Sequence, residues 1–299
     1  MTTFKESTIV LYSFPLYTLF ILAEILYSHF HNLKLYSVKG TIDNILLSSL
    51  NALLDIVMRG ICLLVLNYFY QFHFFEIKNS FWYWFWLVIA QDFMFYWLHR
   101  VDHYCRLFWA IHATHHNSEE FNLTVGFRSS VFQPLYRFIY YIPLALMGFK
   151  GIDIMLVYSA TQIFGILVHT QTIKKLGILE YIFVTPSHHR VHHGKNVPYL
   201  DKNMGMLLII WDKLFGTFEE ESEPVEYGLT KPLEKQDPFT LIFHEWIEMI
   251  KDVKRAPTLK DKLMYIFGPP GWSHDGSKKT SRQLRLEREL ATKEKNLAH

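Results

Sequence analysis

The chain has 299 residues, of which half are hydrophobic, 17% are aromatic and only 19% are charged, and its net charge is +2. Soluble chains of this length usually carry about 25% charged residues, so the composition excludes a disordered protein, a coiled coil and a small disulfide-rich scaffold. Two cysteines are too few for a disulfide framework or a cysteine-based zinc module. The small net charge gives no electrostatic reason to expect nucleic acid as a partner.

Four long apolar segments precede the polar C-terminal part of the chain. They lie at about residues 9–30, 45–70, 81–98 and 135–168. Each is long enough to cross a bilayer or nearly so, because a spanning helix needs about 20 residues. The second segment places Asp55 and Arg59 at helical i,i+4 spacing, where they can pair on one face. The fourth is interrupted at residues 148–153, which leaves open whether it forms two spans or one hairpin.

Together these segments predict an all-α integral membrane helical bundle with four or more spans. The alternative, a soluble protein with unusually buried helices, would have to bury several nearly uncharged stretches in one chain. Charged side chains inside the spans are expected to face the bundle interior or a site, not lipid. The first segment is longer than the apolar core of a signal peptide, and no small-residue cleavage site follows it, so we expect a retained helix.

The composition becomes polar from about Lys174 onward. We expect residues 99–130 and 169–276 to form a helical cap on the bundle, with residues 1–276 making one domain. Residues 277–299 are charged and lack an apolar period wide enough for a core, which predicts a flexible tail or a frayed helix. Lys and Arg residues in the short loops favour a multi-pass topology with the cap and the C-terminus in the cytoplasm and the N-terminus outside.

Ten of the 16 histidines lie between positions 99 and 193, in separated groups. The groups are an HxxxH pattern, an HxxHH pattern, and a second HxxHH pattern directly preceded by one further histidine. A single histidine ends the fourth apolar segment. In chain order these residues are His99, His103, His112, His115, His116, His169, His188, His189, His192 and His193. Since residues i, i+3 and i+4 share one face of an α-helix, each group can present several imidazoles to one point.

These imidazoles predict a site for two metal ions. Neutral imidazole binds Zn, Cu, Fe and Ni, and a single metal takes about four to six ligands, so eight to ten histidines suit two metals better than one. A histidine-rich storage tract is the alternative, but such tracts are usually low-complexity runs. Asp92 lies seven residues before His99 and therefore on the same helical face. There it either accepts a hydrogen bond from a ligand imidazole or makes a buried polar contact within the bundle.

At these histidines the sequence resembles the fatty acid hydroxylase superfamily, which includes the sterol desaturases. Its members are integral membrane, non-haem di-iron enzymes with the patterns HxxxH, HxxHH and HxxHH, whereas soluble di-iron bundles use Glu-x-x-His. The likeness is strongest over residues 80–220. Within the superfamily the sequence looks like the alkylglycerol monooxygenases at segments 116–124, 185–194, 201–203, 208–218, 227–230 and 269–272.

The resemblance implies roles for particular residues. Glu119 matches a glutamate of the alkylglycerol monooxygenase segment and would contact a cofactor or a metal ligand, with a surface acid beside a helix as the alternative. The implied metal ligands are His99, His103, His112, His115, His116, His189, His192 and His193, with His169 and His188 as additions. The metals would be two iron ions, and recombinant protein could carry zinc, since imidazole sites accept both.

The resemblance also implies an activity, namely O2-dependent hydroxylation of a lipid C–H bond by a di-iron monooxygenase. In alkylglycerol monooxygenases the hydroxylated carbon lies next to an ether oxygen, so the ether bond breaks. No GxGxxG segment follows a strand here and no cytochrome b5 signature is visible, so we expect electrons from a separate donor protein or from a reduced pterin. Tetrahydrobiopterin is the donor in the animal enzymes.

Two alternatives stay open. Desaturases and hydroxylases of sterols, fatty acids or carotenoids belong to the same superfamily and share hydrogen abstraction as the first chemical step. A membrane metal transporter or sensor is the alternative from a different class, and it would place histidines along the spans at several depths.

Overall fold

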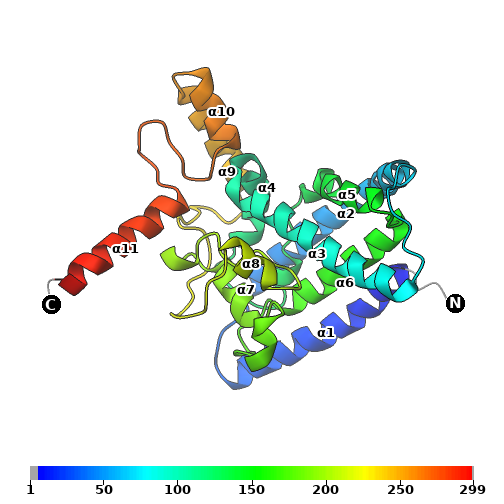
Figure 1. Cartoon of the computed structure of the whole chain (residues 1–299). Coiled ribbons are helices and arrows are strands. Elements are labelled where there is room, and N and C mark those ends of the chain that lie inside the picture. The colour runs from blue at the N-terminus through cyan, green and yellow to red at the C-terminus, as the bar shows by residue number, and fades with distance from the viewer. Residues whose placement is uncertain (1–5, 298–299) are drawn as a thin grey trace.

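The computed structural model describes residues 6–297, and the regular secondary structure in that range is helical (Figure 1). The α-helices are α1 (Glu6–Phe30), α2 (Val38–Tyr70), α3 (Ser80–Tyr104), α4 (Arg106–His116), α5 (Ile142–Leu146), α6 (Gly151–Leu167), α7 (Pro186–His193), α8 (Ile210–Phe215), α9 (Pro238–Arg255), α10 (Leu259–Phe267) and α11 (Ser281–Leu297). Short 3-10 helices lie between them at Val125–Phe127, Gln133–Leu135, Arg137–Tyr141, Gly177–Tyr181 and Val197–Tyr199. The prediction of an all-α protein is therefore confirmed for the described residues.

The long helices α1, α2, α3 and α6 form a bundle. α6 packs against the other three, and a core of buried apolar side chains from α2, α3, α5 and α6 lies between them, including Leu66, Leu87, Leu144 and Ile154. Among the described helices, α1 and α2, with 25 and 33 residues, are long and apolar enough to cross a membrane. α3 is also 25 residues long but rich in Trp and Tyr, and α6 is apolar but has 17 residues.

The helices show how two of the apolar segments are built. α2 begins at Val38 rather than near residue 45, because the Ser37 hydroxyl caps it by accepting a 2.9 Å hydrogen bond from the Gly40 backbone N–H. The segment 135–168 contains one long helix, α6, preceded by short helical turns. The break falls at Gly148, which has a φ of 97° and whose Cβ, if present, would lie 2.1 Å from the Phe75 carbonyl oxygen.

Charged side chains of the bundle pair with one another at partly buried positions. The predicted pair is confirmed, since Arg59 Nε donates to Asp55 Oδ2 at 2.7 Å. Arg59 also pairs with Glu6 of α1, and Arg137 pairs with Asp55. Glu24 of α1 is buried as well. The network joins α1, α2 and the 3-10 helix that holds Arg137, as expected for charges that lipid cannot solvate.

α4 and the helices from α7 onward form a cap at one end of the bundle. α4 packs between α3 and α9, and α9 packs on α10. The α9–α10 hairpin and α11 project from the body of the protein (Figure 1). The predicted charged tail forms the helix α11 from Ser281 to Leu297. It contacts the rest of the protein through Arg285, whose Nη1 donates to the Leu200 carbonyl at 2.5 Å. Residues 298 and 299 of that tail lie outside the described range.

Candidate metal centre

Four elements bring histidines to the end of the bundle that carries the cap. The last two turns of α3, the short helices α4 and α7, and the segment directly after α6 each contribute. α7 is only eight residues long, and its start is fixed by Thr185 at the N-cap and Pro186 at the first helical position. The helical phasing read from the sequence therefore holds in three separate helices, and tertiary packing brings their histidine faces together.

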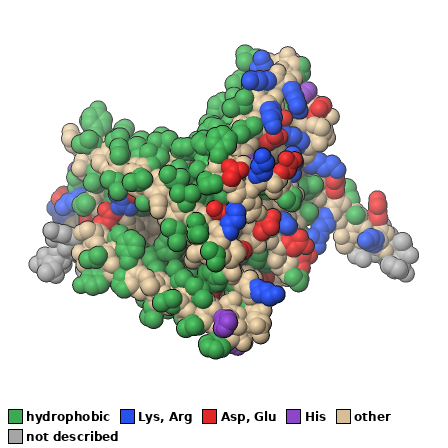
Figure 2. All heavy atoms as spheres, turned by 180° about the vertical axis from the view of Figure 1, so that it is seen from behind, with side chains coloured by type: hydrophobic (Ala, Val, Ile, Leu, Met, Phe, Trp, Pro, Cys, Tyr) green, Lys and Arg blue, Asp and Glu red, His purple; other side chains and the backbone are tan. Residues whose placement is uncertain are grey.

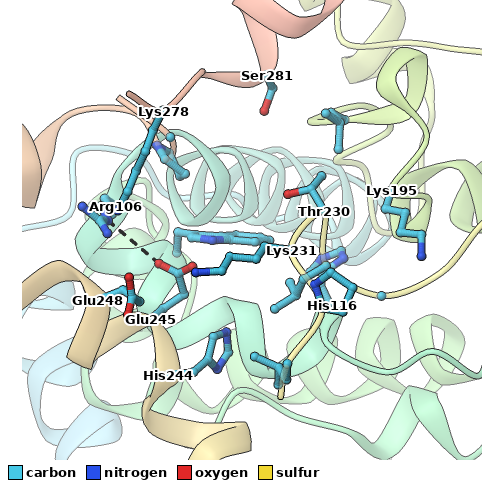
Figure 3. A pocket seen from close by; sticks show the side chains of 18 of the residues that line it. Arg106, His116, Lys195, Thr230, Lys231, His244, Glu245, Glu248, Lys278 and Ser281 are labelled. Atoms are coloured by element: carbon cyan, nitrogen blue, oxygen red, sulfur yellow. Dashed lines mark ion pairs between the residues drawn. The ribbon is translucent and has the colours of Figure 1, made fainter. Parts of the chain in front are cut away.

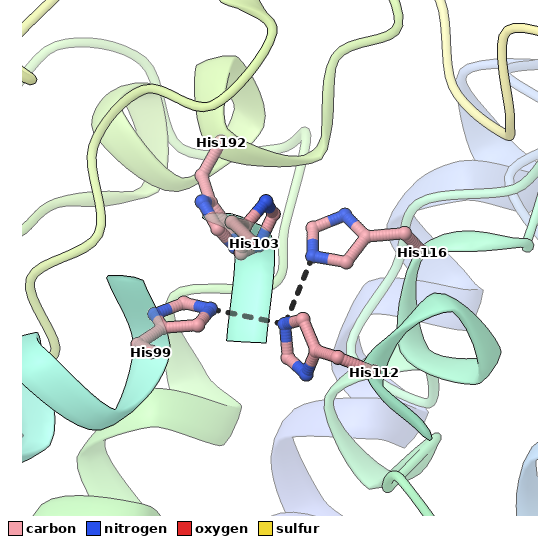
Figure 4. A group of neighbouring side chains, drawn as sticks. All are labelled: His99, His103, His112, His116 and His192. Atoms are coloured by element: carbon pink, nitrogen blue, oxygen red, sulfur yellow. Dashed lines mark hydrogen bonds between the residues drawn. The ribbon is translucent and has the colours of Figure 1, made fainter. Parts of the chain in front are cut away.

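The first group contains five histidines that each place one ring nitrogen within 4.8 Å of the corresponding nitrogens of the others, namely His99, His103, His112, His116 and His192. Their rings point into a common space (Figure 4). The Nε2 atom of His112 lies 3.1 Å from Nε2 of His99 and 3.2 Å from Nε2 of His116. All five residues are buried, so the group is enclosed by protein.

The second group contains four histidines at similarly short separations, namely His115, His169, His189 and His193. The Nε2 atom of His169 lies 2.9 Å from Nε2 of His189 and 3.4 Å from Nε2 of His115. The two groups adjoin, since the ring centroids of His116 and His193 are 4.4 Å apart and the rings are stacked. This arrangement places two all-imidazole sites side by side.

Burial keeps most of these imidazoles neutral. Removal from water, followed by the proximity of other imidazoles, lowers the pKa of His112, His116, His192 and His193 well below the ordinary value of 6.5. For the partly buried His115, burial lowers the pKa to about 4. A neutral imidazole has a free lone pair, which is the form that binds a metal ion.

The loop 201–204 orients three histidines of the first group through their Nδ1 atoms. The Nδ1 atom of His99 lies 2.8 Å from the Met204 carbonyl oxygen, and that of His192 lies 3.0 Å from the Lys202 carbonyl oxygen. Asp201 Oδ1 lies 3.3 Å from Nδ1 of His103. A proton on Nδ1 leaves the lone pair on Nε2, so the loop selects the tautomer that can bind a metal through Nε2.

Backbone carbonyls orient two of the four histidines of the second group in the same way. The Nδ1 atom of His115 lies 2.7 Å from the Arg128 carbonyl oxygen, and that of His169 lies 2.8 Å from the Gly165 carbonyl oxygen. The buried Arg128 side chain in turn donates from Nε to the carbonyl oxygen of Thr114, at 3.0 Å. Arg128 therefore contacts α4 twice, through its backbone carbonyl at His115 and through its side chain at Thr114. These two contacts fix the loop that contains Arg128 against α4.

The site fits two divalent transition-metal ions by the chemistry of its donors. The buried Nε2 atoms of His103, His192 and His193 have no hydrogen-bond partner within residues 6–297. Unpartnered buried polar atoms are costly. One metal ion in the first group would satisfy His103 and His192, and a second ion in the second group would satisfy His193. Five imidazoles in one group and four in the other suit iron or zinc.

Three residues named in the sequence analysis lie outside both groups. His188 helps to cap α7, with its Nδ1 atom 3.4 Å from the Thr185 backbone nitrogen. Asp92 accepts hydrogen bonds from the backbone N–H groups of Leu207 and Leu208 and from Trp211 Nε1, at 2.9–3.0 Å, so its partners are not imidazoles. Glu119 is exposed, and a Cβ at Gly228 would lie 3.2 Å from its Cγ.

The orienting role of the loop 201–204 does not follow from the resemblance, although the segment 201–203 contributes to that resemblance. Asp201 and Asn203 have φ values of 53° and 54°, a left-handed conformation that Asp and Asn adopt more readily than most residues. Asn203 Nδ2 donates to the carbonyl oxygens of His188 and Glu219 at 3.1 and 2.8 Å. An Asp-x-Asn pattern just after a histidine group was the signal that could have indicated this loop.

A cavity of about 790 Å³ reaches the histidines from the cap side. Its inner wall includes His103, His116, His192 and His193, and its outer walls come from α9, the segment 228–235 and the residues before α11. Polar side chains line it, among them Arg106, Lys231 and Glu245 (Figure 3). The Arg106 side chain is buried and pairs with Asp252 at 2.7 Å. The cavity is large enough for part of a lipid or for a small polar cofactor.

Comparisons with a family model and with known proteins both point to lipid-modifying oxygenases. Residues 84–217 match the fatty acid hydroxylase family. Human alkylglycerol monooxygenase is 43% identical over 198 residues, which are 65% of this chain and 43% of the human protein. The alkylglycerol monooxygenase of Xenopus tropicalis is 37% identical over 222 residues, 73% of this chain and 49% of its own length.

A more distant relative is the ornithine lipid hydroxylase OlsE of Rhizobium tropici, 33% identical over 152 residues that make up 50% of this chain and 46% of the relative. The chain thus spans less than half the length of the curated relatives it matches. No solved structure matches it. The matched segment 84–217 contains all nine grouped histidines, so this part of the chain is the part that is similar to the fatty acid hydroxylase family, and the alkylglycerol monooxygenases are among the relatives of the chain.

Proposed function

We propose that the protein is a membrane-bound, non-haem di-iron monooxygenase that hydroxylates a lipid C–H bond with O2. The observation that carries the proposal is the pair of adjoining, buried, all-imidazole groups inside the segment that matches the family. Iron would be held in one position by His99, His103, His112, His116 and His192, and in the other by His115, His169, His189 and His193. Bound iron supplies the activation of O2 and the oxidising power for attack on a C–H bond.

The protein's own residues prepare the site for that chemistry. The Nδ1 contacts made by the loop 201–204 and by backbone carbonyls hold the rings in place, so little reorganisation is needed when a metal binds. The buried position of the groups excludes bulk water, which would otherwise consume reactive species. The cavity that reaches His103, His116 and His192 is the route by which a substrate carbon approaches.

We propose an ether lipid of the alkylglycerol class as substrate, because the relatives with the highest identities quoted above carry that name. Insertion of one oxygen atom into the C–H bond beside the ether oxygen gives a hemiacetal, which separates into a fatty aldehyde and glycerol. The second oxygen atom leaves as water and requires two electrons and two protons. These come from an external donor, either a reduced pterin such as tetrahydrobiopterin or a separate electron-transfer protein.

We further propose that α1, α2, α3 and α6 all cross the membrane, so that residues 1–276 form one multi-pass domain with its cap in the cytoplasm. The gathering of the grouped histidines at one end of the bundle supports a single catalytic site rather than a transport path, which would distribute ligands at several depths. Glu119 and Asp92 keep only indirect roles in this proposal, since neither touches a grouped histidine.

Substrate competition tests the proposal. Membranes containing the protein are incubated with O2, a reduced pterin and either an alkylglycerol, a free sterol or a fatty acid, and the products are identified by mass spectrometry. Fatty aldehyde formed only from the alkylglycerol supports the proposed substrate. A new double bond or hydroxyl group on the sterol or fatty acid would favour the related desaturases and hydroxylases. Metal passage across liposomes without O2 uptake would refute the enzymatic function.

A further inference from the structure

The α9–α10 hairpin carries an apolar stripe that lies exposed within the described structure. On α10 the stripe consists of Leu259, Leu263 and Phe267, which are 72%, 48% and 58% exposed. These residues recur every four positions and so lie along one face of the helix. On α9 it continues with Phe239 and Ile250, which are 62% and 49% exposed. Two consecutive helices therefore present large apolar side chains to their surroundings.

The stripe is distinct from the other faces of α9. Leu241, Met249 and Asp252 are buried on the face that packs toward α4. A further face, including Glu248, lines the cavity that reaches the metal centre. Ile247 belongs to the cavity lining and is also 38% exposed, so it lies at the border between the cavity and the stripe.

The hairpin turns its apolar side toward the bundle. In Figure 2 the projecting part of the cap is hydrophobic on the side that faces the bundle, and this surface is continuous with the hydrophobic surface of the bundle itself. Charged side chains gather on the other side of the projection. A bilayer that surrounds α1 and α2 would thus meet the hydrophobic side of the hairpin at its surface.

Basic residues flank the stripe in the way expected at a membrane surface. Lys260 and Lys262 lie on either side of the α10 stripe and are exposed, and Lys254 is exposed beside Ile250 near the turn between the two helices. Long basic side chains can extend from an apolar face to lipid headgroups and pair with anionic lipids. An apolar stripe with basic borders suits a lipid surface better than a dry protein–protein contact, where lysine is depleted.

We propose that the α9–α10 hairpin lies on the surface of the bilayer that α1 and α2 cross, with its stripe inserted at the boundary between headgroups and acyl chains. The proposal rests on the membrane placement given under the proposed function. α9 also lines the cavity, and Ile247 lies at the edge of that cavity. The contact of the hairpin with the bilayer therefore keeps Ile247 beside the lipid surface. A lipid then needs to cross only the width of α9 to pass from the bilayer into the cavity.

Photo-cross-linking in the full-length protein tests this contact without relying on activity. Leu263 or Ile250 is replaced by p-benzoylphenylalanine, and the protein is placed in nanodiscs of phosphatidylcholine and phosphatidylglycerol that contain an alkyne-tagged phospholipid. Arg255 is the matched control, because it lies five residues after Ile250 and therefore about 140° around the same helix. Leu19 of α1, which is 64% exposed, is the positive control within a membrane-spanning helix. Metal content is measured for every variant to establish that the fold is intact.

We expect lipid labelling at positions 263 and 250 to exceed that at position 255 by at least about five-fold, as for an interfacial helix with one inserted face. Labelling at position 19 with none at 263 and 250 would overturn the hairpin contact while leaving the membrane placement and the proposed function intact. Cross-linked protein dimers through position 263 would also overturn it, because the stripe would then be covered by a second copy of the chain. No labelling at position 19 would overturn the membrane placement itself.

Discussion

His188 and His189 are adjacent in the sequence but differ in what they contact. His189 faces His169 within the second group, whereas His188 helps to cap α7. We therefore expect His192→Ala and His115→Ala each to lower bound metal from two ions per chain toward one and to abolish turnover, since each removes a ligand from one group. His188→Ala is the neighbouring control and should keep close to two ions. Metal analysis of the purified variants checks this, and equal metal loss in all three would contradict the assignment.

The carboxylate of Asp201 acts on a metal position through His103. Removing such a hydrogen-bond partner typically costs about 10- to 100-fold in metal affinity or activity. We expect Asp201→Asn to weaken metal binding by that order and Asp201→Glu to restore part of it. Competition with a calibrated chelator measures the affinity. Glu119→Gln is the control, because Glu119 is exposed and contacts no grouped histidine, and an unchanged affinity in Asp201→Asn would exclude the orienting role.

At the scale of the element, α2 is joined to its neighbours by the ion pairs of Asp55. Asp55→Leu removes the acceptor of both Arg59 and Arg137 and leaves Glu6 as the one remaining acid of this network. We expect a loss of about 2–4 kcal/mol, or roughly 5–10 °C in melting temperature, because buried or partly buried charges would lose their partner. Thermal unfolding of the detergent-solubilised protein measures this.

Lys175→Met serves as the control for that change. Its pair with Glu220 is 3.5 Å long and both side chains are at least half exposed, and such surface pairs contribute little. Its melting temperature should stay within about 1 °C of the starting value. An equal shift in both variants would mean that the Asp55 network is not a specific link between the helices.

The sequence predicted the helical elements well because their signals are local. Apolar length indicated α1 and α2, the i,i+4 rule predicted the pair of Asp55 and Arg59, and the same rule placed histidines on shared helix faces. The rest depended on tertiary contacts. Sequence spacing cannot reveal that the loop 201–204 contacts Nδ1 of His99. Nor can it reveal that the His188 ring helps to cap its own helix, α7. Asp92 had the right phase to meet His99, but the backbone of residues 207–208 reaches its carboxylate instead.

At the scale of the whole molecule, the neutral imidazoles couple stability to pH. The unfolded chain binds protons on its histidines below about pH 6.5, whereas the folded site resists protonation until about pH 4 at His115. The stability of the metal-free protein should therefore be independent of these groups above pH 7 and fall as the pH decreases from 6.5 toward 4. Melting temperatures of the metal-free protein across this range, with a variant lacking His115 and His193 for comparison, measure the effect. A melting temperature that stays level between pH 7 and 5 would contradict it.

The two metal positions differ in how far apart along the chain their ligands lie. Four of the five histidines of the first group precede residue 117, whereas the second group has only His115 before His169. During synthesis the first position can thus capture an ion once α3 and α4 have formed, but the second requires α6 to be inserted and α7 to have emerged from the ribosome. Maturation would proceed through a form with one metal, and a chain interrupted between α4 and α6 would hold one ion without gaining the second.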